Sequence, residues 1–332
     1  MVQHDRPTDR IGSAILLALV LLAAACSQDD GPADASDPVM LYTCVDDAVA
    51  QAMIEEFERA NSGTDVELFR APTAELNARV AGDVRSGGLR ADVVWACDPI
   101  TMQGLVDQDL VGGWTPDNAP EIPAEYRTAD WVGAAVLYIV AVHRNDVPAP
   151  QTWSDLASAD YSGGLAIPDP AFAASALGAL GYFAGAEGYG LDFYRGLVDH
   201  GAVQVSTPDE VTTGVAQGIY HAGITTANSA YVAQESGSPI GVTWPEPGAV
   251  AVYGPVALAT DAAGSTSAQD FISFVISEPG QTTLADAGSY PTRTGVSGPT
   301  VPVDAPVVQP DWPTIVTHKD DLLADYQQLL GS

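Results

Sequence analysis

Basic residues are scarce in this chain of 332 residues. Lysine and arginine together number 12 against 43 aspartates and glutamates, which gives a formal net charge of −31 at pH 7. So negative a surface repels phosphate backbones and anionic lipid headgroups. The composition therefore excludes charge-driven binding to nucleic acid or to acidic membranes, and it favours solubility as the role of the acidic residues.

The sequence motifs of common hydrolases and nucleotide-binding enzymes are also missing. There is no G-x-S-x-G, no H-E-x-x-H, no P-loop and no S-x-x-K with its partner motifs. The five histidines show no spacing typical of a metal site, and the chain has three cysteines. We therefore predict no catalytic residue, no metal site and no cofactor.

A long membrane-spanning run is absent too. The apolar run of residues 11–25 is shorter than the roughly 20 residues that cross a bilayer. Arg6 and Arg10 precede this run and Cys26 follows it, which is the pattern of a secretory signal peptide. The last residues of the run and the cysteine, LAAAC, resemble a bacterial lipobox, in which the cysteine is lipidated.

We predict a signal peptide in residues 1–25, lipidation of Cys26 and a polar linker in residues 26–38. This places the protein at the outer face of the cytoplasmic membrane, in the cell envelope or periplasm, with the lipid anchor as its only membrane contact. An ordinary signal peptide or an N-terminal anchor helix is the alternative.

From Val39 onward, short β-branched runs alternate with amphipathic segments, which is typical of a parallel sheet covered by helices. A first series predicts strands at residues 39–43, 65–69 and 91–96, with helices between them. A second series predicts strands at residues 165–168, 202–206 and 222–226, with helices from about residue 172, Pro208 and Ala227. Each series is typical of a doubly wound sheet.

Two further apolar runs, residues 131–142 and 250–260, are long enough to leave one sheet and enter another. The chain is therefore expected to cross twice between two doubly wound α/β lobes. We assign lobe I to residues 39–140 and 259–332, lobe II to residues 141–258, and the C-terminal helices near residues 267–277 and 318–330 to lobe I.

This order of elements resembles the periplasmic solute-binding proteins of ABC importers, in the class that includes ferric-iron, thiamine and phosphonate binders. The resemblance covers nearly all of residues 39–330. It is carried by YTCVDDAVAQAMIEEFERANSG, RAPTAELNARV, ADVVWACDP, TWSDLASADYSGGLAIPDP and TSAQDFISFVISEPGQ. It implies two lobes hinged by two strands, a ligand cleft between them at the strand ends, and a monomer that works with an ABC permease and its ATPase.

In the implied fold the first and third strands are neighbours, and Cys44 and Cys97 each follow one of these strands. Thiols so placed outside the cytoplasm become oxidised. The resemblance thus implies a Cys44–Cys97 disulfide at the rim of the cleft. A thiolate metal site is the alternative, but it needs more ligands than two cysteines.

Relatives that bind ferric iron carry adjacent tyrosines just after a strand of the second lobe. The corresponding stretch here, ITTANSAYVA, offers Thr225, Thr226, Asn228 and a single Tyr231. Because no tyrosine pair is present, iron is disfavoured as the ligand.

An anionic ligand would need hydroxyl residues at helix starts, such as Ser175, with Arg70 as the one well-placed cation. Asp46 and Asp98 oppose it with negative charge, whereas aromatic residues near the cleft favour a flat or cationic organic solute. The predicted ligand-binding residues are Thr43, Cys44, Asp46, Arg70, Trp95, Asp98, Ser175, Thr225, Thr226, Asn228, Tyr231, Trp244 and Tyr253.

We predict an extracytoplasmic solute-binding subunit of an ABC importer that captures a small polar organic solute, thiamine-like or another organic cation, by hinge closure. A phosphonate, a phosphate ester or ferric iron is the alternative ligand. From other classes, an exported hydrolase that uses cleft carboxylates such as Asp46 and Asp98, or a sensory solute-binding subunit, remains open.

Overall fold

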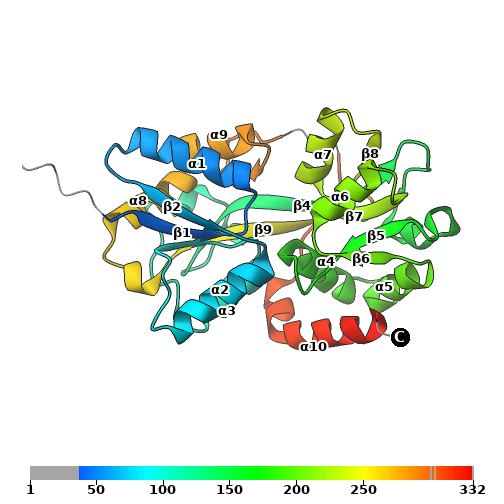
Figure 1. Cartoon of the computed structure of the whole chain (residues 1–332), viewed down its shortest axis with the longest axis horizontal. Helices are drawn as coiled ribbons and strands as arrows, with labels where there is room; N and C mark the ends of the chain where they lie inside the picture. The colour runs from blue at the N-terminus through cyan, green and yellow to red at the C-terminus, as the bar shows by residue number, and fades with distance from the viewer. Residues whose placement is uncertain (1–36, 300, 303, 331–332) are drawn as a thin grey trace, which may run out of the picture. The chain divides into compact units, whose positions relative to one another are not determined.

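The computed structural model describes residues 37–299, 301–302 and 304–330 (Figure 1). The predicted signal peptide, the lipidation of Cys26 and nearly all of the predicted linker lie outside these residues. Within the described ranges, no helix has both the length and the apolar character that crossing a membrane requires.

The first lobe begins with parallel strands in the spatial order β2-β1-β3. These strands are β1 (Val39–Thr43), β2 (Val66–Arg70) and β3 (Val93–Trp95), and the helices that follow them are α1 (Asp47–Ala60), α2 (Thr73–Arg85) and α3 (Pro99–Val106). Helix α1 forms where Val49, Met53 and Phe57 recur on one buried face. The first predicted series of strands and helices is therefore confirmed.

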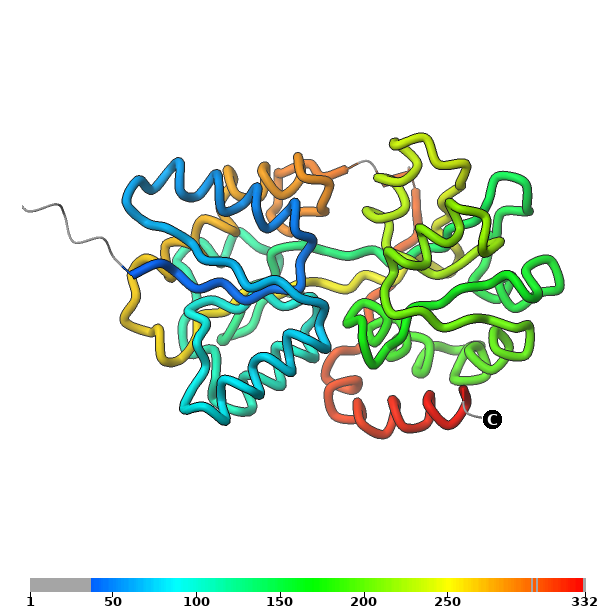
Figure 2. The backbone as a smooth tube through the Cα atoms, in the orientation of Figure 1, coloured from blue at the N-terminus to red at the C-terminus, as the bar shows by residue number. Residues whose placement is uncertain are grey.

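Two long antiparallel strands, β4 (Val132–Arg144) and β9 (Ala249–Leu258), run between the lobes (Figure 2). The last residues of β9 pair with β3 of the first lobe. The last residues of β4 pair with β7 (Ala222–Thr226) and β8 (Ile240–Thr243) of the second lobe. The predicted crossing strands are confirmed, with one difference: they pair on both sides, so a single sheet runs through both lobes.

The second lobe continues this sheet with β5 (Leu165–Pro168) and β6 (Val203–Val205), which are parallel to each other. Its helices are α4 (Ala174–Gly185), α5 (Gly190–Asp199), α6 (Pro208–Ala216) and α7 (Ala227–Glu235). Short 3-10 helices fill several connections: Ala119–Glu121, Ala124–Tyr126, Trp153–Ala157, Ala159–Tyr161 and Thr260–Ala262.

The C-terminal part of the chain supports both lobes. Helices α8 (Thr266–Val275) and α9 (Glu278–Asp286) pack on α1 of the first lobe, with the Phe57 and Phe271 ring centroids 5.1 Å apart. The short strands β10 (Tyr290–Pro291) and β11 (Val307–Val308) pair with β4 and β9, respectively.

The last helix, α10 (Trp312–Leu330), packs against α5, α4 and α3, below α4 and α5 in Figure 1. Glycines of α4 make this close approach possible, because a Cβ added at Gly181 would lie 2.5 Å from the Ile315 side chain. Ile315, Tyr326 and Leu329 belong to the buried cluster of the second lobe. This helix therefore packs on α4 and α5 of the second lobe and on α3 of the first, and its assignment to lobe I stays a prediction.

Candidate ligand-binding pocket

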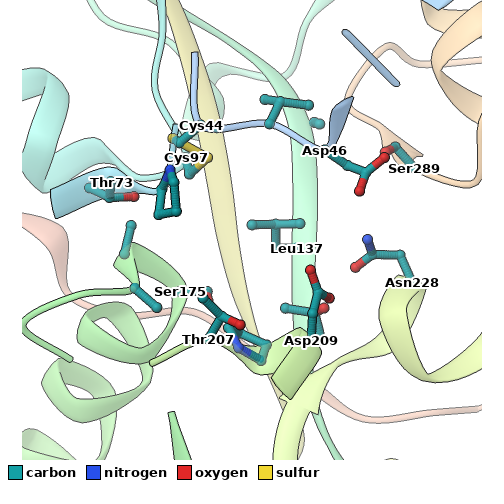
Figure 3. A pocket seen from close by; sticks show the side chains of 18 of the residues that line it. Cys44, Asp46, Thr73, Cys97, Leu137, Ser175, Thr207, Asp209, Asn228 and Ser289 are labelled. Carbon is teal, nitrogen blue, oxygen red and sulfur yellow. A yellow bond between two sulfur atoms is a disulfide. The ribbon is translucent and has the colours of Figure 1, made fainter. Parts of the chain in front are cut away.

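A pocket of about 270 Å³ is lined by residues of both lobes (Figure 3). The first lobe supplies the loop after β1, the residue that ends β3 and the start of α2. The second lobe supplies the starts of α4, α6 and α7. Leu137 of β4 lies between the two sets in Figure 3, and Gly254 of β9 also lines the pocket. The hinge strands thus form part of its wall.

Some helix starts at the pocket are capped by side chains. At α1, the Asp46 carboxylate accepts a hydrogen bond from the Ala48 N–H at 2.9 Å. At α6, the Thr207 hydroxyl accepts one from the Glu210 N–H at 3.2 Å. The first turns of these helices are therefore partly satisfied within the protein.

Other helix starts at the pocket have no side-chain cap. The N-cap residues of α2, α4 and α7 are Pro72, Ala173 and Thr226, and none makes a side-chain capping bond. All three line the pocket. The first N–H groups of a helix have no partner inside the helix and carry the positive end of its dipole. Such starts attract an anionic group of a ligand.

Two nearly buried hydroxyls accompany these uncapped starts. Ser175 and Thr226 are each 6% exposed and line the pocket, and neither hydroxyl has a hydrogen-bond partner among the described residues. Thr43 and Thr225 are different, because their hydroxyls donate to the carbonyl oxygens of Trp95 and Pro208, both at 2.8 Å. The hydroxyls of these two threonines are bonded to backbone carbonyls, and neither residue lines the pocket.

Charged groups of both signs line the pocket. Asp46 and Asp209 come from opposite lobes, and Arg70 donates from Nε to the Val45 carbonyl at 3.0 Å. Asp98, in contrast, is fully buried outside the pocket lining, where its Oδ1 accepts the Thr101 N–H at 2.8 Å. Burial raises the pKa of the Asp98 carboxyl.

The aromatic residues expected in the cleft are mostly elsewhere. Trp95 lines the pocket but is 0% exposed, so its ring offers no open face for stacking. The Trp244 Nε1 donates to the Tyr231 hydroxyl at 2.9 Å, and Tyr253 packs edge-on against Tyr126. Tyr231, Trp244 and Tyr253 do not line the pocket.

The predicted disulfide is confirmed. Cys44 and Cys97 are bonded, with their Cα atoms 5.9 Å apart. Both residues line the pocket, where Figure 3 shows the bond beside the loops that lead into α1 and α3. The disulfide therefore ties together two loops that shape the pocket.

A family model described as bacterial extracellular solute-binding protein matches residues 42–289. The chain belongs to this family.

Solved structures of periplasmic binding proteins share the fold of this solute-binding protein. AfuA from Actinobacillus pleuropneumoniae, solved with exogenous fructose-6-phosphate bound, has a TM-score of 0.80 at 16% identity, covering 89% of this chain and 99% of that chain. Iron-bound HitA from Pseudomonas aeruginosa has a TM-score of 0.75 at 19% identity, covering 87% and 99%. The predicted two-lobed α/β fold is confirmed by these matches.

A curated relative of this solute-binding protein is the probable ABC transporter periplasmic-binding protein y4fP of Sinorhizobium fredii. It is 30% identical over 122 residues, which is 35% of this chain and 33% of the relative. The chain thus matches about a third of the length of this relative.

The pocket of this solute-binding protein brings together part of the predicted set. It includes Cys44, Asp46, Arg70, Trp95, Ser175, Thr226 and Asn228. It does not include Thr43, Asp98, Thr225, Tyr231, Trp244 and Tyr253. Among the lining residues that the sequence reasoning missed are Thr73, Leu137, Phe172, Asp209 and Ser289. Helix-start signals lie beside Thr73 and Asp209, whereas Ser289 follows α9 with no signal that points to a pocket.

Proposed function

We propose that this protein is the extracytoplasmic solute-binding subunit of an ABC importer and that it captures a small organic phosphate ester or phosphonate. It binds its ligand as a monomer, carries out no chemical step, and delivers the ligand to a permease and its ATPase. Export by the signal peptide and lipidation at Cys26 belong to the same proposal.

One observation carries the choice of ligand: uncapped helix starts and unpaired hydroxyls meet in one pocket. The first turns of α2 and α4 supply N–H donors, and Ser175 supplies a hydroxyl. Phosphate and phosphonate oxygens accept several hydrogen bonds at once, and charge makes each bond stronger than a neutral one. Arg70 adds a positive side chain at the pocket.

The other candidate ligands find less support. A thiamine-like ring would need open aromatic faces, but Trp244 and Tyr253 lie outside the pocket and Trp95 is buried. Ferric iron would need phenolates, and Tyr231 is bonded to Trp244 away from the pocket. Within the described residues, no group of three or more His, Cys, Asp and Glu side chains is placed to hold a metal ion.

Isothermal titration calorimetry and thermal unfolding of residues 37–332 test the proposal with O-phosphoethanolamine, fructose 6-phosphate, thiamine and ferric citrate. A ligand at 100 times its Kd adds about 2.7 kcal/mol to the free energy of unfolding, which raises Tm by a few degrees. We expect such a shift with at least one phosphate-bearing compound.

A matched pair of variants locates the binding. Ser175→Ala removes one hydroxyl from the pocket and should weaken phosphate binding about tenfold. Ser236→Ala removes an exposed hydroxyl that does not line the pocket and should leave binding unchanged. The proposal would be overturned if only thiamine or ferric citrate raised Tm, or if Ser175→Ala and Ser236→Ala bound the phosphate compound with equal affinity.

A further inference from the structure

We infer that the ligand carries a positively charged amino group as well as its phosphate or phosphonate, and that Asp46 and Asp209 hold this amino group between the lobes. The inference rests on the proposed function for the anionic end of the ligand. It concerns a second end of the same pocket, which the phosphate-binding features leave unexplained.

The pocket has two chemically different ends. In Figure 3, Ser175 and Thr73 lie on one side of Leu137, whereas Asp46, Ser289 and Asn228 lie on the other side. Asp209 projects into the space below Asp46. Asp46 precedes α1 in the first lobe, and Asp209 is in the first turn of α6 in the second lobe. The two carboxylates thus reach one space from opposite lobes.

Neither carboxylate is neutralised by the protein. The capping of α6 is carried out by Thr207 and by Glu210, whose carboxylate accepts the Ser206 N–H at 3.0 Å. Asp209 is left without a hydrogen bond or ion pair to any described residue. Asp46 uses one oxygen, Oδ1, for the Ala48 N–H and has its second oxygen free.

Basic groups do not offset this charge. Among the described residues, Arg70 is the one basic side chain that lines the pocket. Its Nε is bonded to the Val45 carbonyl, and no ion pair joins it to either aspartate. Two negative charges therefore face the pocket without an ion pair to any described residue.

Further polar groups at this end also lack partners. Ser289 is 7% exposed and lines the pocket, and its hydroxyl has no hydrogen-bond partner in the described part of the chain. The buried Oδ1 of Asn228 is an acceptor without a donor. An ammonium group has three N–H donors and no acceptor, so it can satisfy the two carboxylates and the Asn228 oxygen together.

Lobe closure makes the cation necessary. Closure around a ligand brings groups of the two lobes closer, and two carboxylates that approach each other raise the energy of the closed state. A cation between them reverses the sign of this contribution. Only a ligand that brings its own positive charge then favours closure at both ends of the pocket. Small amino-alkyl phosphates and phosphonates have the required chemistry.

Two probes that differ only in the amino group test the inference. O-phosphoethanolamine and ethyl phosphate are titrated calorimetrically into residues 37–332. We expect the wild-type protein to bind O-phosphoethanolamine at least tenfold more tightly. Asp46→Asn and Asp209→Asn should each reduce this preference to below threefold. The affinity for ethyl phosphate should stay the same or rise, because each substitution removes one of the two carboxylates that repel each other on closure. Asn caps a helix as well as Asp, so Asp46→Asn should keep α1 intact.

Asp270→Asn, an exposed substitution on α8 outside the pocket, serves as the matched control and should retain the full preference. Equal affinities of the wild-type protein for the two probes would overturn the inference and leave the proposed function standing. A loss of affinity for both probes alike in the aspartate variants would also overturn it. If neither probe binds the wild-type protein but fructose 6-phosphate does, the inference fails and the proposed function stands. If none of the three phosphate-bearing compounds binds, the proposed function itself fails.

Discussion

Helix N-termini around the pocket fall into two groups. At α1, α3 and α6, a side chain of the protein accepts a hydrogen bond from the first turn. At α2, α4 and α7, no side chain does. A missing cap costs about 1 kcal/mol of helix stability. The uncapped starts of α2, α4 and α7 line the pocket, and so do the capped starts of α1 and α6. Under the proposed function, a ligand can take the place of a missing cap only at an uncapped start.

The largest expected effect on the free energy of unfolding comes from reducing the disulfide beside the capped starts of α1 and α3. The Cys44–Cys97 disulfide joins the loops that lead into α1 and α3 and closes a sequence separation of 53 residues. In the chain-entropy model, opening such a loop lowers the free energy of unfolding by about 4 kcal/mol. We expect dithiothreitol to lower the urea midpoint accordingly, with free thiols counted by mass spectrometry.

A Cys44→Ser/Cys97→Ser variant controls for other effects of the reductant. Its midpoint should match that of the reduced wild-type protein and should not change further in dithiothreitol. Identical midpoints for the oxidised and the fully reduced wild-type protein would show that the capped starts hold their positions without the disulfide.

A smaller effect is expected when an uncapped start is converted into a capped one. Ala173, the N-cap of α4, has φ −109° and ψ 119°, an extended conformation that capping residues adopt. Ala173→Asp should raise the free energy of unfolding by less than about 1 kcal/mol, because placing a carboxylate at a position that is 9% exposed offsets part of the capping gain. The same carboxylate occupies the N–H groups and repels an anion, so affinity for O-phosphoethanolamine should fall at least about tenfold.

Chemical denaturation and calorimetry on the same preparation measure both effects. Ala173→Asn adds a cap without a charge, so the difference between the two variants isolates the repulsion. Unchanged affinity in Ala173→Asp would mean that the ligand does not use the first turn of α4, and the contrast between capped and uncapped starts would lose its functional meaning.

Sequence patterns predicted the fold well because they reflect local physics. The alternation of β-branched runs with amphipathic segments places β1 to β3 and β5 to β7 close to the observed residues. Packing partners were harder to predict. Leu322, Leu323, Tyr326 and Leu330 mark an apolar face on α10, but a pattern does not say which surface covers that face. The small residues of α4 allow α10 to pack closely against α4, which covers part of this face.

The pocket was predicted less completely, because one position along the backbone decides what a side chain faces. Thr225 and Thr226 are neighbours at the end of β7, yet Thr225 bonds to the α6 backbone and Thr226 lines the pocket. Successive strand residues point to opposite faces, and the sequence alone does not tell which face is the ligand side. Trp244 and Tyr253 do not line the pocket, since a ring near a strand end packs into the core as readily as into a cleft.

The smallest expected effect is at α3, whose cap, Asp98, is fully buried. Burial raises its pKa in the folded state, so the folded protein binds a proton there more readily than the unfolded chain does. Stability from this group is therefore present at low pH and lost as pH rises from about 3.9, the ordinary aspartate pKa, through the raised value. Asp98→Asn keeps a capping oxygen without the charge and should raise the free energy of unfolding at pH 7 by about 1 kcal/mol.

Asp98→Ala, which loses the cap, should lower the free energy of unfolding at pH 7. Urea midpoints between pH 4 and pH 7 distinguish the variants, and if Asn destabilises as much as Ala at pH 7, attraction to Lys319 outweighs the cost of burying the carboxylate.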